Sequence, residues 1–212
     1  MHFLITAGPT REYIDSVRFL SNASTGRMGF ECAAAAVRRG HTVTLVTGPT
    51  HLESPRKVRC VPVVSARQMH DACRAAFGHC DAVIMTAAVA DYRPRRTQRT
   101  KRAKQGGPVT LELTANPDIL ASLGRAKQGQ VLIGFALQDT AGRQRAREKL
   151  AKKNLDAIVL NTPAALGAKG SQVELLTAGG QWRELGPLSK RALATRLVRL
   201  AERLAKRQSK AK

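Results

Sequence analysis

The sequence predicts an α/β fold, with a mainly parallel sheet that carries helices on both faces. Short runs rich in Val, Ile and Leu alternate with longer helical stretches along the chain, and such continuously apolar strands are typical of a parallel sheet that is covered on both sides. In addition, residues 2–47 contain a strand, a loop with glycines, a helix and a second strand, which together form a βαβ unit.

Each element follows from its local composition. Residues 2–6 (HFLIT) are an apolar run that stops at a Gly-Pro turn, and residues 30–39 are Ala-rich and end before Gly40, a common helix terminator. The alternation continues with strands over residues 42–47, 58–64, 82–86, 109–113, 131–136 and 157–160. The helices between them are expected over residues 66–77, from Pro117 to Ser122 with Asn116 as N-cap, and over 143–152. This order of elements is Rossmann-like.

The C-terminal part of the chain departs from this alternation. Residues 173–177 and 181–185 flank Ala178-Gly179-Gly180, which predicts a β-hairpin. A last helix starts after Pro187 with Ser189 as its N-cap, and four leucines lie on one face of it, at positions 193, 197, 200 and 204. We therefore expect one domain over residues 1–206 and a basic, disordered tail over residues 207–212.

Composition excludes several classes of protein. The chain has 212 residues, of which 43% are hydrophobic, and no apolar run approaches the roughly 18–20 residues of a membrane span. The apolar run at the N-terminus is too short for a signal peptide, so we expect a cytoplasmic protein. Cys32, Cys60, Cys73 and Cys80 form no C-x-x-C pair. Reduced thiols are expected rather than disulfides or a zinc site, and no metal ligands can be assigned.

The positive charge is concentrated in three segments. The formal net charge is +21, and the basic residues gather in segments 93–104, 143–153 and 190–212. This pattern fits either a nucleic-acid footprint or separate anion-binding and solubilising roles. Aromatic residues make up 4% of the chain and Trp182 is the only Trp. Specific nucleic-acid binding is therefore not expected, because stacking residues are absent from the basic stretches.

Ligands of open parallel sheets bind beyond the carboxyl ends of the strands, so the loops after the strands are the candidate sites. The loop with Gly8 lacks a G-x-G-x-x-G fingerprint and could be a plain turn. The next loop, SNASTGRMG, places Ser24, Thr25, Gly26 and Gly29 before the Ala-rich helix, where backbone N–H groups could bind a phosphate. An ordinary capped loop is the alternative.

Two further loops carry charged residues. Asp91, in TAAVADYRP, could accept hydrogen bonds from a base or sugar, hold Mg²⁺, or simply cap a turn. The basic loop over residues 93–104 could close over phosphates or be solvated. Lys149 and Lys153 are four residues apart on one helix face. That spacing suits a phosphate clamp, although solvated lysines are the common alternative.

Several long motifs occur in one order along the chain: ITAGPTREYID, SNASTGRMGF, TAAVADYRP, NPDIL, IGFALQ and KKNLDAIVLN. Through them the sequence resembles the phosphopantothenate–cysteine ligases (phosphopantothenoylcysteine synthetases) of coenzyme A biosynthesis. The resemblance implies that 4′-phosphopantothenate reacts with CTP, rather than ATP, to give an acyl-cytidylate and pyrophosphate. Cysteine then attacks the acyl carbon and releases CMP. It also implies Mg²⁺, a homodimer, for which the hairpin over residues 173–185 is a candidate interface, and a separate decarboxylase that acts next, because no decarboxylase half is seen in this sequence.

The resemblance also implies roles for residues. Asn22 handles the acyl intermediate and Lys101, in a mobile basic flap, acts on the charged first step. The implied nucleotide-binding residues are Ala87, Asp91, Lys101, Pro117, Asp118, Ile119, Leu120, Phe135, Lys149 and Lys153. Two departures from the family pattern are Lys101-Arg102-Ala103-Lys104, which lacks a middle lysine, and Gln138, where many members have Glu. An NAD(P)-binding reductase and a basic nucleic-acid-associated protein remain as alternative functions.

Overall fold

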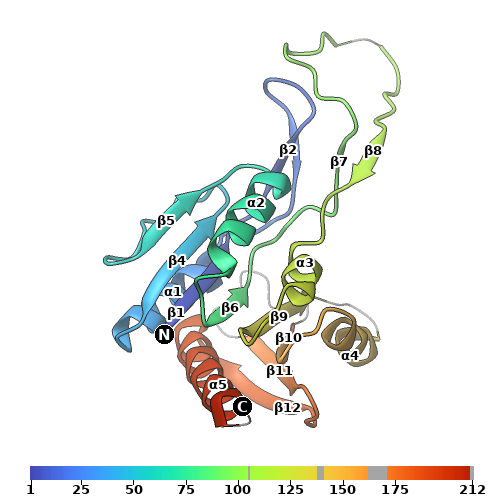
Figure 1. The fold of residues 1–212 in the computed structure, drawn as a ribbon. Coiled ribbons are helices and arrows are strands. Elements are labelled where there is room, and N and C mark those ends of the chain that lie inside the picture. The colour runs from blue at the N-terminus through green and yellow to red at the C-terminus, as the bar shows by residue number, and fades with distance from the viewer. Residues whose placement is uncertain (105, 138–140, 162–170, 211–212) are drawn as a thin grey trace.

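The computed structural model describes residues 1–104, 106–137, 141–161 and 171–210. Gln138 and the last two residues of the expected tail lie outside these ranges. Within them, eight strands form one sheet in the order β12-β11-β10-β9-β6-β1-β4-β5 (Figure 1). The strands are β1 (His2–Ala7), β4 (Thr42–Thr47), β5 (Arg59–Pro62), β6 (Ala82–Met85), β9 (Val131–Leu137), β10 (Ala157–Asn161), β11 (Ser171–Thr177) and β12 (Arg183–Leu188).

The six strands from β10 to β5 are parallel, and β11 and β12 are antiparallel additions at one edge. From β1 the chain builds outward to β4 and β5 and then returns to place β6, β9 and β10 on the other side. The strand order therefore reverses between β1 and β6. The predicted Rossmann-like sheet with a C-terminal hairpin and helix is confirmed.

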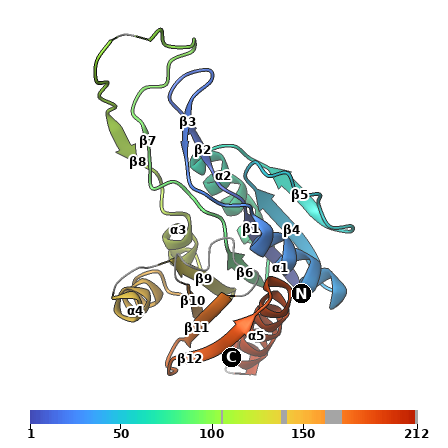
Figure 2. The same cartoon turned by 180° about the vertical axis from the view of Figure 1, so that it is seen from behind.

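Side chains alternate between two cores, one on each face of the sheet. In β1, Phe3 and Ile5 face one core and Leu4 faces the other, and all three are fully buried. The first core is covered by α1 (Arg27–Arg38) and α5 (Lys190–Lys210). The second is covered by α2 (Ala66–Phe77), α3 (Ile119–Arg125) and α4 (Gly142–Lys152). The result is three layers, with the sheet between two layers of helices (Figures 1 and 2).

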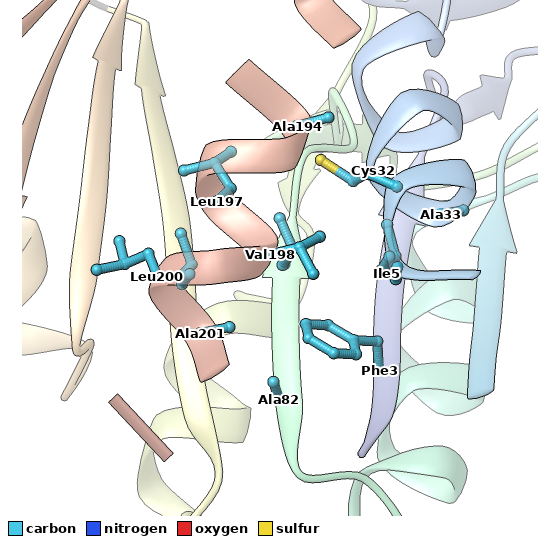
Figure 3. Packing of buried hydrophobic residues seen from close by; sticks show 14 of the residues in the cluster. Phe3, Ile5, Cys32, Ala33, Ala82, Ala194, Leu197, Val198, Leu200 and Ala201 are labelled. Atoms are coloured by element: carbon cyan, nitrogen blue, oxygen red, sulfur yellow. The ribbon is translucent and has the colours of Figure 1, made fainter. Parts of the chain in front are cut away.

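Helices α1 and α5 pack against each other as well as against the sheet. Figure 3 shows Cys32 and Ala33 of α1 beside Ala194, Leu197 and Val198 of α5. The small side chains of α1 allow this close approach. A charged cluster holds the same two helices together at the surface: Glu202 accepts hydrogen bonds from Arg39 at 2.7 and 2.8 Å and contacts Nε2 of His41 at 2.7 Å.

Two short ribbons rise beyond the carboxyl edge of the sheet. One is the hairpin of β2 (Arg11–Tyr13) and β3 (Phe19–Ser21), and the other pairs β7 (Tyr92–Pro94) with β8 (Leu113–Ala115). Figures 1 and 2 both show them as an arm that stands away from the helices and the sheet. The first ribbon was not predicted, because three-residue strands leave no periodic pattern.

The element boundaries also differ from the predictions. The predicted strand over residues 109–113 is wrong: pairing starts only at Leu113, and Val109 and Leu111 are exposed. Helix α1 begins at Arg27, three residues before its predicted start. Asp118, not Asn116, caps α3, since its carboxylate accepts a hydrogen bond from the Ala121 N–H at 3.0 Å.

The last helix is longer than predicted. It continues to Lys210, four residues beyond the expected end of the folded chain. Gln208 supplies the reason, because its amide donates a 2.9 Å hydrogen bond to Asp156, which directly precedes β10. None of the helices in the described ranges combines the length and apolar character that a membrane crossing requires.

The four cysteines carry free thiols, as expected. Cys32, Cys73 and Cys80 are buried and Cys60 is exposed. Burial raises the pKa of Cys73 and of Cys80 to about 12. The buried thiols are therefore neutral packing groups.

Candidate functional site

The loops after β1 and β6 lie side by side where the strand order reverses. The Ala88 N–H donates to the carbonyl oxygen of Gly8 at 3.0 Å, and the Thr10 N–H donates to that of Ala88 at 3.3 Å. The hydroxyl of Thr10 accepts a further hydrogen bond from the Ala90 N–H at 2.9 Å. The reversal point of an open parallel sheet is where ligands bind, so this pair of loops forms the floor of the candidate site.

Glycines allow the start of α1 to approach this floor. A Cβ at Gly29 would lie 2.5 Å from the Cβ of Ala7 and 2.7 Å from the carbonyl oxygen of Thr6. A Cβ at Gly26, which has a φ of +77°, would lie 3.1 Å from the backbone nitrogen of Gly8. Side chains at these positions would push the helix away from the strand. The structure thus brings together Gly8, Gly26 and Gly29 of the predicted anion loop.

The start of α1 presents backbone donors at the reversal point. The N-cap residue of this helix is Gly26, which has no side chain that could cap it. The hydroxyls of Ser24 and Thr25 are turned to the loop itself, where they accept hydrogen bonds from the N–H groups of Gly26 and Arg27 at 3.2 and 3.4 Å. An anion at this helix end would meet the positive end of the helix dipole. Ser24 and Thr25 therefore shape the loop in this structure.

Asn22 joins the anion loop to the loop after β6. Its side-chain Nδ2 donates to the carbonyl oxygen of Val89 at 3.0 Å and more weakly to that of Ala88 at 3.4 Å. The donor side of the amide is therefore directed at the protein. The exposed Asn22 keeps Oδ1 as an acceptor at the floor of the site, next to the loop that follows β6, which it contacts at Ala88 and Val89.

A second group of predicted residues meets at the carboxyl end of β9. Lys149 Nζ donates to the carbonyl oxygen of Phe135 at 2.7 Å, and Lys153 Nζ contacts Oδ2 of Asp118 at 2.6 Å. Burial lowers the pKa of Lys149, as does repulsion from Lys153, while Asp118 and Asp91 act in the opposite direction. For Asp118, burial raises the pKa, but the hydrogen bonds from Lys153 and the Ala121 N–H outweigh it and leave the value below the ordinary one. This edge thus holds two ammonium groups against two carboxylates.

The NPDIL segment joins the two groups of residues. Asn116 donates from Nδ2 to the carbonyl oxygen of Ala90 at 2.8 Å and accepts from Arg93 at Oδ1 at 3.1 Å. The sequence predicted Asn116 as a helix cap and not in this role, because its partners Arg93 and Ala90 are 23 and 26 residues away in the chain. Pro117 and Asp118 follow at the surface, whereas the Ile119 and Leu120 side chains are buried in the second core. Only the backbone of these last two residues is available to a ligand.

Lys101 lies apart from these residues. The Gln98 N–H donates to the carbonyl oxygen of Ile14 at 3.0 Å, and the Arg102 N–H donates to Oδ2 of Asp15 at 3.2 Å. The basic loop thus lies along the tip of the β2–β3 hairpin, at the far end of the arm from α3 and α4 (Figures 1 and 2). The structure does not bring Lys101 together with Lys149 and Lys153.

Comparisons with known proteins identify the family of the chain. The family model described as the DNA/pantothenate metabolism flavoprotein C-terminal domain matches residues 1–204. The coenzyme A biosynthesis bifunctional protein CoaBC of Bacillus subtilis is 45% identical over 194 residues, which are 89% of this chain and 48% of that protein. CoaBC of Escherichia coli K12 is 43% identical over 167 residues, 76% of this chain and 41% of that protein. The chain therefore spans about half the length of these relatives.

Solved structures give the same result for the fold. The crystal structure of the C-terminal domain of a CoaBC protein superposes with a TM-score of 0.85 at 40% identity, and it covers 97% of this chain and 95% of that one. A Cab2 variant in complex with phosphopantothenate-cysteine shares the fold at 15% identity, with a TM-score of 0.78 over 99% of this chain and 88% of that one. The resemblance found in the motifs is confirmed at the level of the family. The chain belongs to the family of the DNA/pantothenate metabolism flavoprotein C-terminal domain.

Proposed function

We propose that the chain is a ligase that joins 4′-phosphopantothenate to L-cysteine through an acyl-cytidylate, as a step of coenzyme A biosynthesis. The observation that carries this proposal is the meeting of two anion-binding features at one edge of the sheet: the glycine-lined start of α1 and the Lys149–Lys153 pair. The relatives from Bacillus subtilis and Escherichia coli, both named for coenzyme A biosynthesis, support the choice of reaction.

In the first half-reaction, a carboxylate oxygen of phosphopantothenate attacks the α-phosphorus of CTP, and the bond to the departing pyrophosphate breaks. All reactants are anions, so the site must supply positive charge. Lys149 and Lys153 would leave the Phe135 carbonyl oxygen and Asp118 to bind the phosphates. The start of α1 would hold a further phosphate through its N–H groups.

Mg²⁺ fits this site as a partner of the triphosphate. Within the described ranges, no three His, Cys, Asp or Glu side chains are grouped so that they could hold a metal ion. Mg²⁺ in nucleotide sites needs only one or two protein carboxylates, because phosphates and water complete its shell. Asp91 is exposed at the edge and its charge reaches Lys149, so it is our candidate ligand. The ion would neutralise charge on the phosphates.

In the second half-reaction, the amine of cysteine attacks the acyl carbon, the bond to the CMP phosphate breaks, and the amine loses a proton. Because Nδ2 of Asn22 is engaged by the Val89 carbonyl, Oδ1 is the atom that can meet an N–H of the attacking amine. Asn22 would then orient the nucleophile toward the acyl carbon. The product keeps the cysteine carboxylate, which a decarboxylase can remove next.

We propose a homodimer and place its interface on the arm. The hairpin over residues 173–185 uses its apolar side chains internally, since Val173 and Leu176 are buried in the two cores. By contrast, Val109, Leu111 and Leu113 are 52%, 37% and 46% exposed at every second position of the arm. Light scattering should give a dimer for the unchanged chain and a monomer for a variant with Asp at positions 109 and 111.

A pyrophosphate-release assay tests the proposed reaction. The chain is mixed with each of the four nucleoside triphosphates, with and without phosphopantothenate and cysteine. We expect release with CTP and Mg²⁺ that requires phosphopantothenate but not cysteine, and amide formation only when cysteine is added. Equal or faster release with ATP would contradict the nucleotide, and no release with any nucleotide would contradict the ligase itself. A reductase or a nucleic-acid-binding protein would give no release.

A further inference from the structure

The carboxylate of Asp15 connects two segments that are far apart in the sequence. Asp15 is 1% exposed, although it lies in the turn of the β2–β3 hairpin. Its Oδ1 accepts hydrogen bonds from the N–H groups of Val17 at 2.9 Å and Arg18 at 2.8 Å. Its Oδ2 accepts from the Arg102 N–H at 3.2 Å and from Nε of Arg18 at 3.0 Å. One oxygen therefore shapes the turn, and the other holds the basic loop.

Arg18 strengthens the same connection. Its guanidinium donates from Nη2 to the carbonyl oxygen of Arg102 while Nε contacts Asp15. Both the N–H and the carbonyl group of Arg102 are thus bound to the hairpin tip. Lys101 precedes Arg102 directly, so its backbone position depends on these bonds.

The positive charges around Asp15 give its carboxylate a reason to bind both segments. Arg18, Lys101, Arg102 and Lys104 line a crevice of about 580 Å³ between the hairpin tip and the basic loop. Four cations at one place repel each other, and Asp15 is the carboxylate that meets them. Hydrogen bonds from the Arg18 and Val17 N–H groups are the main reason that the pKa of Asp15 falls to about 2. The carboxylate is therefore ionised under all ordinary assay conditions.

We propose that Asp15 is a positioning residue, which fixes the backbone of Arg102 and thereby the place of Lys101 on the arm. The role assigned to Lys101, in the charged first half-reaction, requires the arm to bring Lys101 to the nucleotide, because in this structure Lys101 lies apart from Lys149 and Lys153. That role rests on the proposed function. The connection between hairpin and loop does not, and it can be measured without catalysis.

Asp15→Asn separates the two functions of the side chain. The amide oxygen can still accept from the Val17 and Arg18 N–H groups, so the turn is retained. The amide NH₂ then replaces Oδ2 and faces two donors, the Arg102 N–H and Nε of Arg18, so the bond to the loop is lost. Glu112→Gln is the matched control. Glu112 is an exposed carboxylate of the same arm, 3.9 Å from Arg95 in a solvent-exposed pair.

Two measurements test the proposal. Trypsin cleavage after Lys101 and Arg102 should be about 10-fold faster in Asp15→Asn than in the unchanged chain, because cleavage requires a released loop. Single-turnover pyrophosphate release should fall about 10- to 100-fold, with the KM for cysteine unchanged. Lys101→Gln should show a similar loss of release, and the double variant should be little slower than either single variant, because both changes act through the same ammonium group.

The outcomes separate this proposal from the proposed function. If the unchanged chain releases no pyrophosphate, the ligase assignment fails, and the trypsin result still decides whether Asp15 holds the loop. Cleavage and release at the rates of the Glu112→Gln control would overturn the positioning role. Effects of Asp15→Asn and Lys101→Gln that multiply would overturn it too, since Asp15 would then act by another route.

A second variant approaches the contact from the loop. Arg102→Pro removes the N–H that Asp15 binds and leaves both hairpin bonds in place, whereas Arg102→Ala removes the side chain and keeps the N–H. If Asp15→Asn does not fold, this pair decides. A full-length Arg102→Gly variant keeps the N–H but has a more flexible loop backbone. Its trypsin cleavage after Lys101 should be faster than in the unchanged chain, and that rate serves as the reference for a loosened loop. Arg102→Pro should release pyrophosphate at least 10-fold more slowly than Arg102→Ala, and equal rates would overturn the proposal.

Discussion

Lys149 shows how one side chain can couple a binding site to pH. It is largely enclosed beside β9, and burial, with repulsion from Lys153, lowers its pKa from the ordinary 10.5. Only the charged form attracts a triphosphate strongly. As pH rises, affinity for the nucleotide should therefore begin to decline before the pH reaches 10.5, the ordinary pKa of lysine.

We expect kcat/KM for CTP to fall as pH rises through this lowered pKa. Lys149→Gln should be about 100-fold slower at neutral pH and should lack this alkaline fall. Folding stability should change in the opposite direction. Between the lowered pKa and 10.5 the unfolded chain binds more protons than the folded chain, so the Lys149 contribution to stability rises with pH. Urea unfolding across this range measures it. Lys152→Gln, on the exposed side of α4, is the control and should keep the alkaline fall.

Asn22 allows the two half-reactions to be distinguished. Asn22→Asp places a negative charge where Nδ2 now donates to the Ala88 and Val89 carbonyls. We expect amide formation to slow much more than anhydride formation, so that acyl-cytidylate accumulates in quenched-flow samples. Asn116→Asp loses a comparable bond, to Ala90, and should slow both half-reactions together. Parallel losses in Asn22→Asp would mean that Asn22 only holds the loop.

At the scale of elements, the position of α1 depends on the missing side chain of Gly29, where a Cβ would make the closer contacts of the two glycines at its start. Gly29→Ala would place a Cβ 2.5 Å from that of Ala7. Overpacking of this kind costs about 1–3 kcal/mol, and it should also displace the helix end that we assign to phosphate binding. Gly78→Ala is the matched control, since Gly78 ends α2 at a φ of −63° with nothing within 4 Å of a new Cβ. Denaturant unfolding and the KM for CTP should change for Gly29→Ala and stay nearly constant for the control.

The elements that the sequence predicted are those whose side chains alternate or repeat within one segment. Strands β1, β4 and β9 are buried on both faces, and α5 carries its leucines on one side, so a local pattern marks each of them. The β2–β3 hairpin is held instead by distant partners: the backbone N–H of Arg11 donates to the Val64 carbonyl oxygen, and the Glu12 carboxylate accepts from the Ala66 N–H. The sequence of residues 11–21 alone contains no pattern that predicts these hydrogen bonds.

At the scale of the molecule, the same distinction applies to the candidate site. The loops at the carboxyl edge were predicted because parallel strands end together, and the structure brings Asn22, the glycines and the two lysines to that edge. That the basic loop lies on the hairpin, away from this edge, could not be predicted, because it depends on contacts such as Asp15 with Arg102. Spacing in a sequence does not fix where a long loop folds back.

The end of α5 lies at the opposite edge of the sheet from the candidate site, because Gln208 binds Asp156 before the start of β10. Deletion of residues 207–212 should therefore leave kcat/KM nearly unchanged. Loss of the Gln208 hydrogen bond should lower the free energy of unfolding by about 0.5–1.5 kcal/mol. Loss of three cations should weaken binding to heparin and reduce its salt dependence. Gln208→Ala in the full chain should reproduce the stability loss alone, and a large loss of activity in the folded truncation would place the tail in the site.

The buried cysteines make the two layers of helices separately measurable by alkylation. Cys32 lies beside α5 in the first core (Figure 3). Cys73, on the buried face of α2, and Cys80, just after that helix, belong to the second core. Helix α5 follows an edge strand, but α2 is tied into the chain between β5 and β6. Under native conditions, iodoacetamide should thus modify the exposed Cys60 first, then Cys32, and finally Cys73 and Cys80. The difference between the alkylation rate of Cys32 and the rates of Cys73 and Cys80 measures how much more readily the α1–α5 side of the sheet opens than the α2 side.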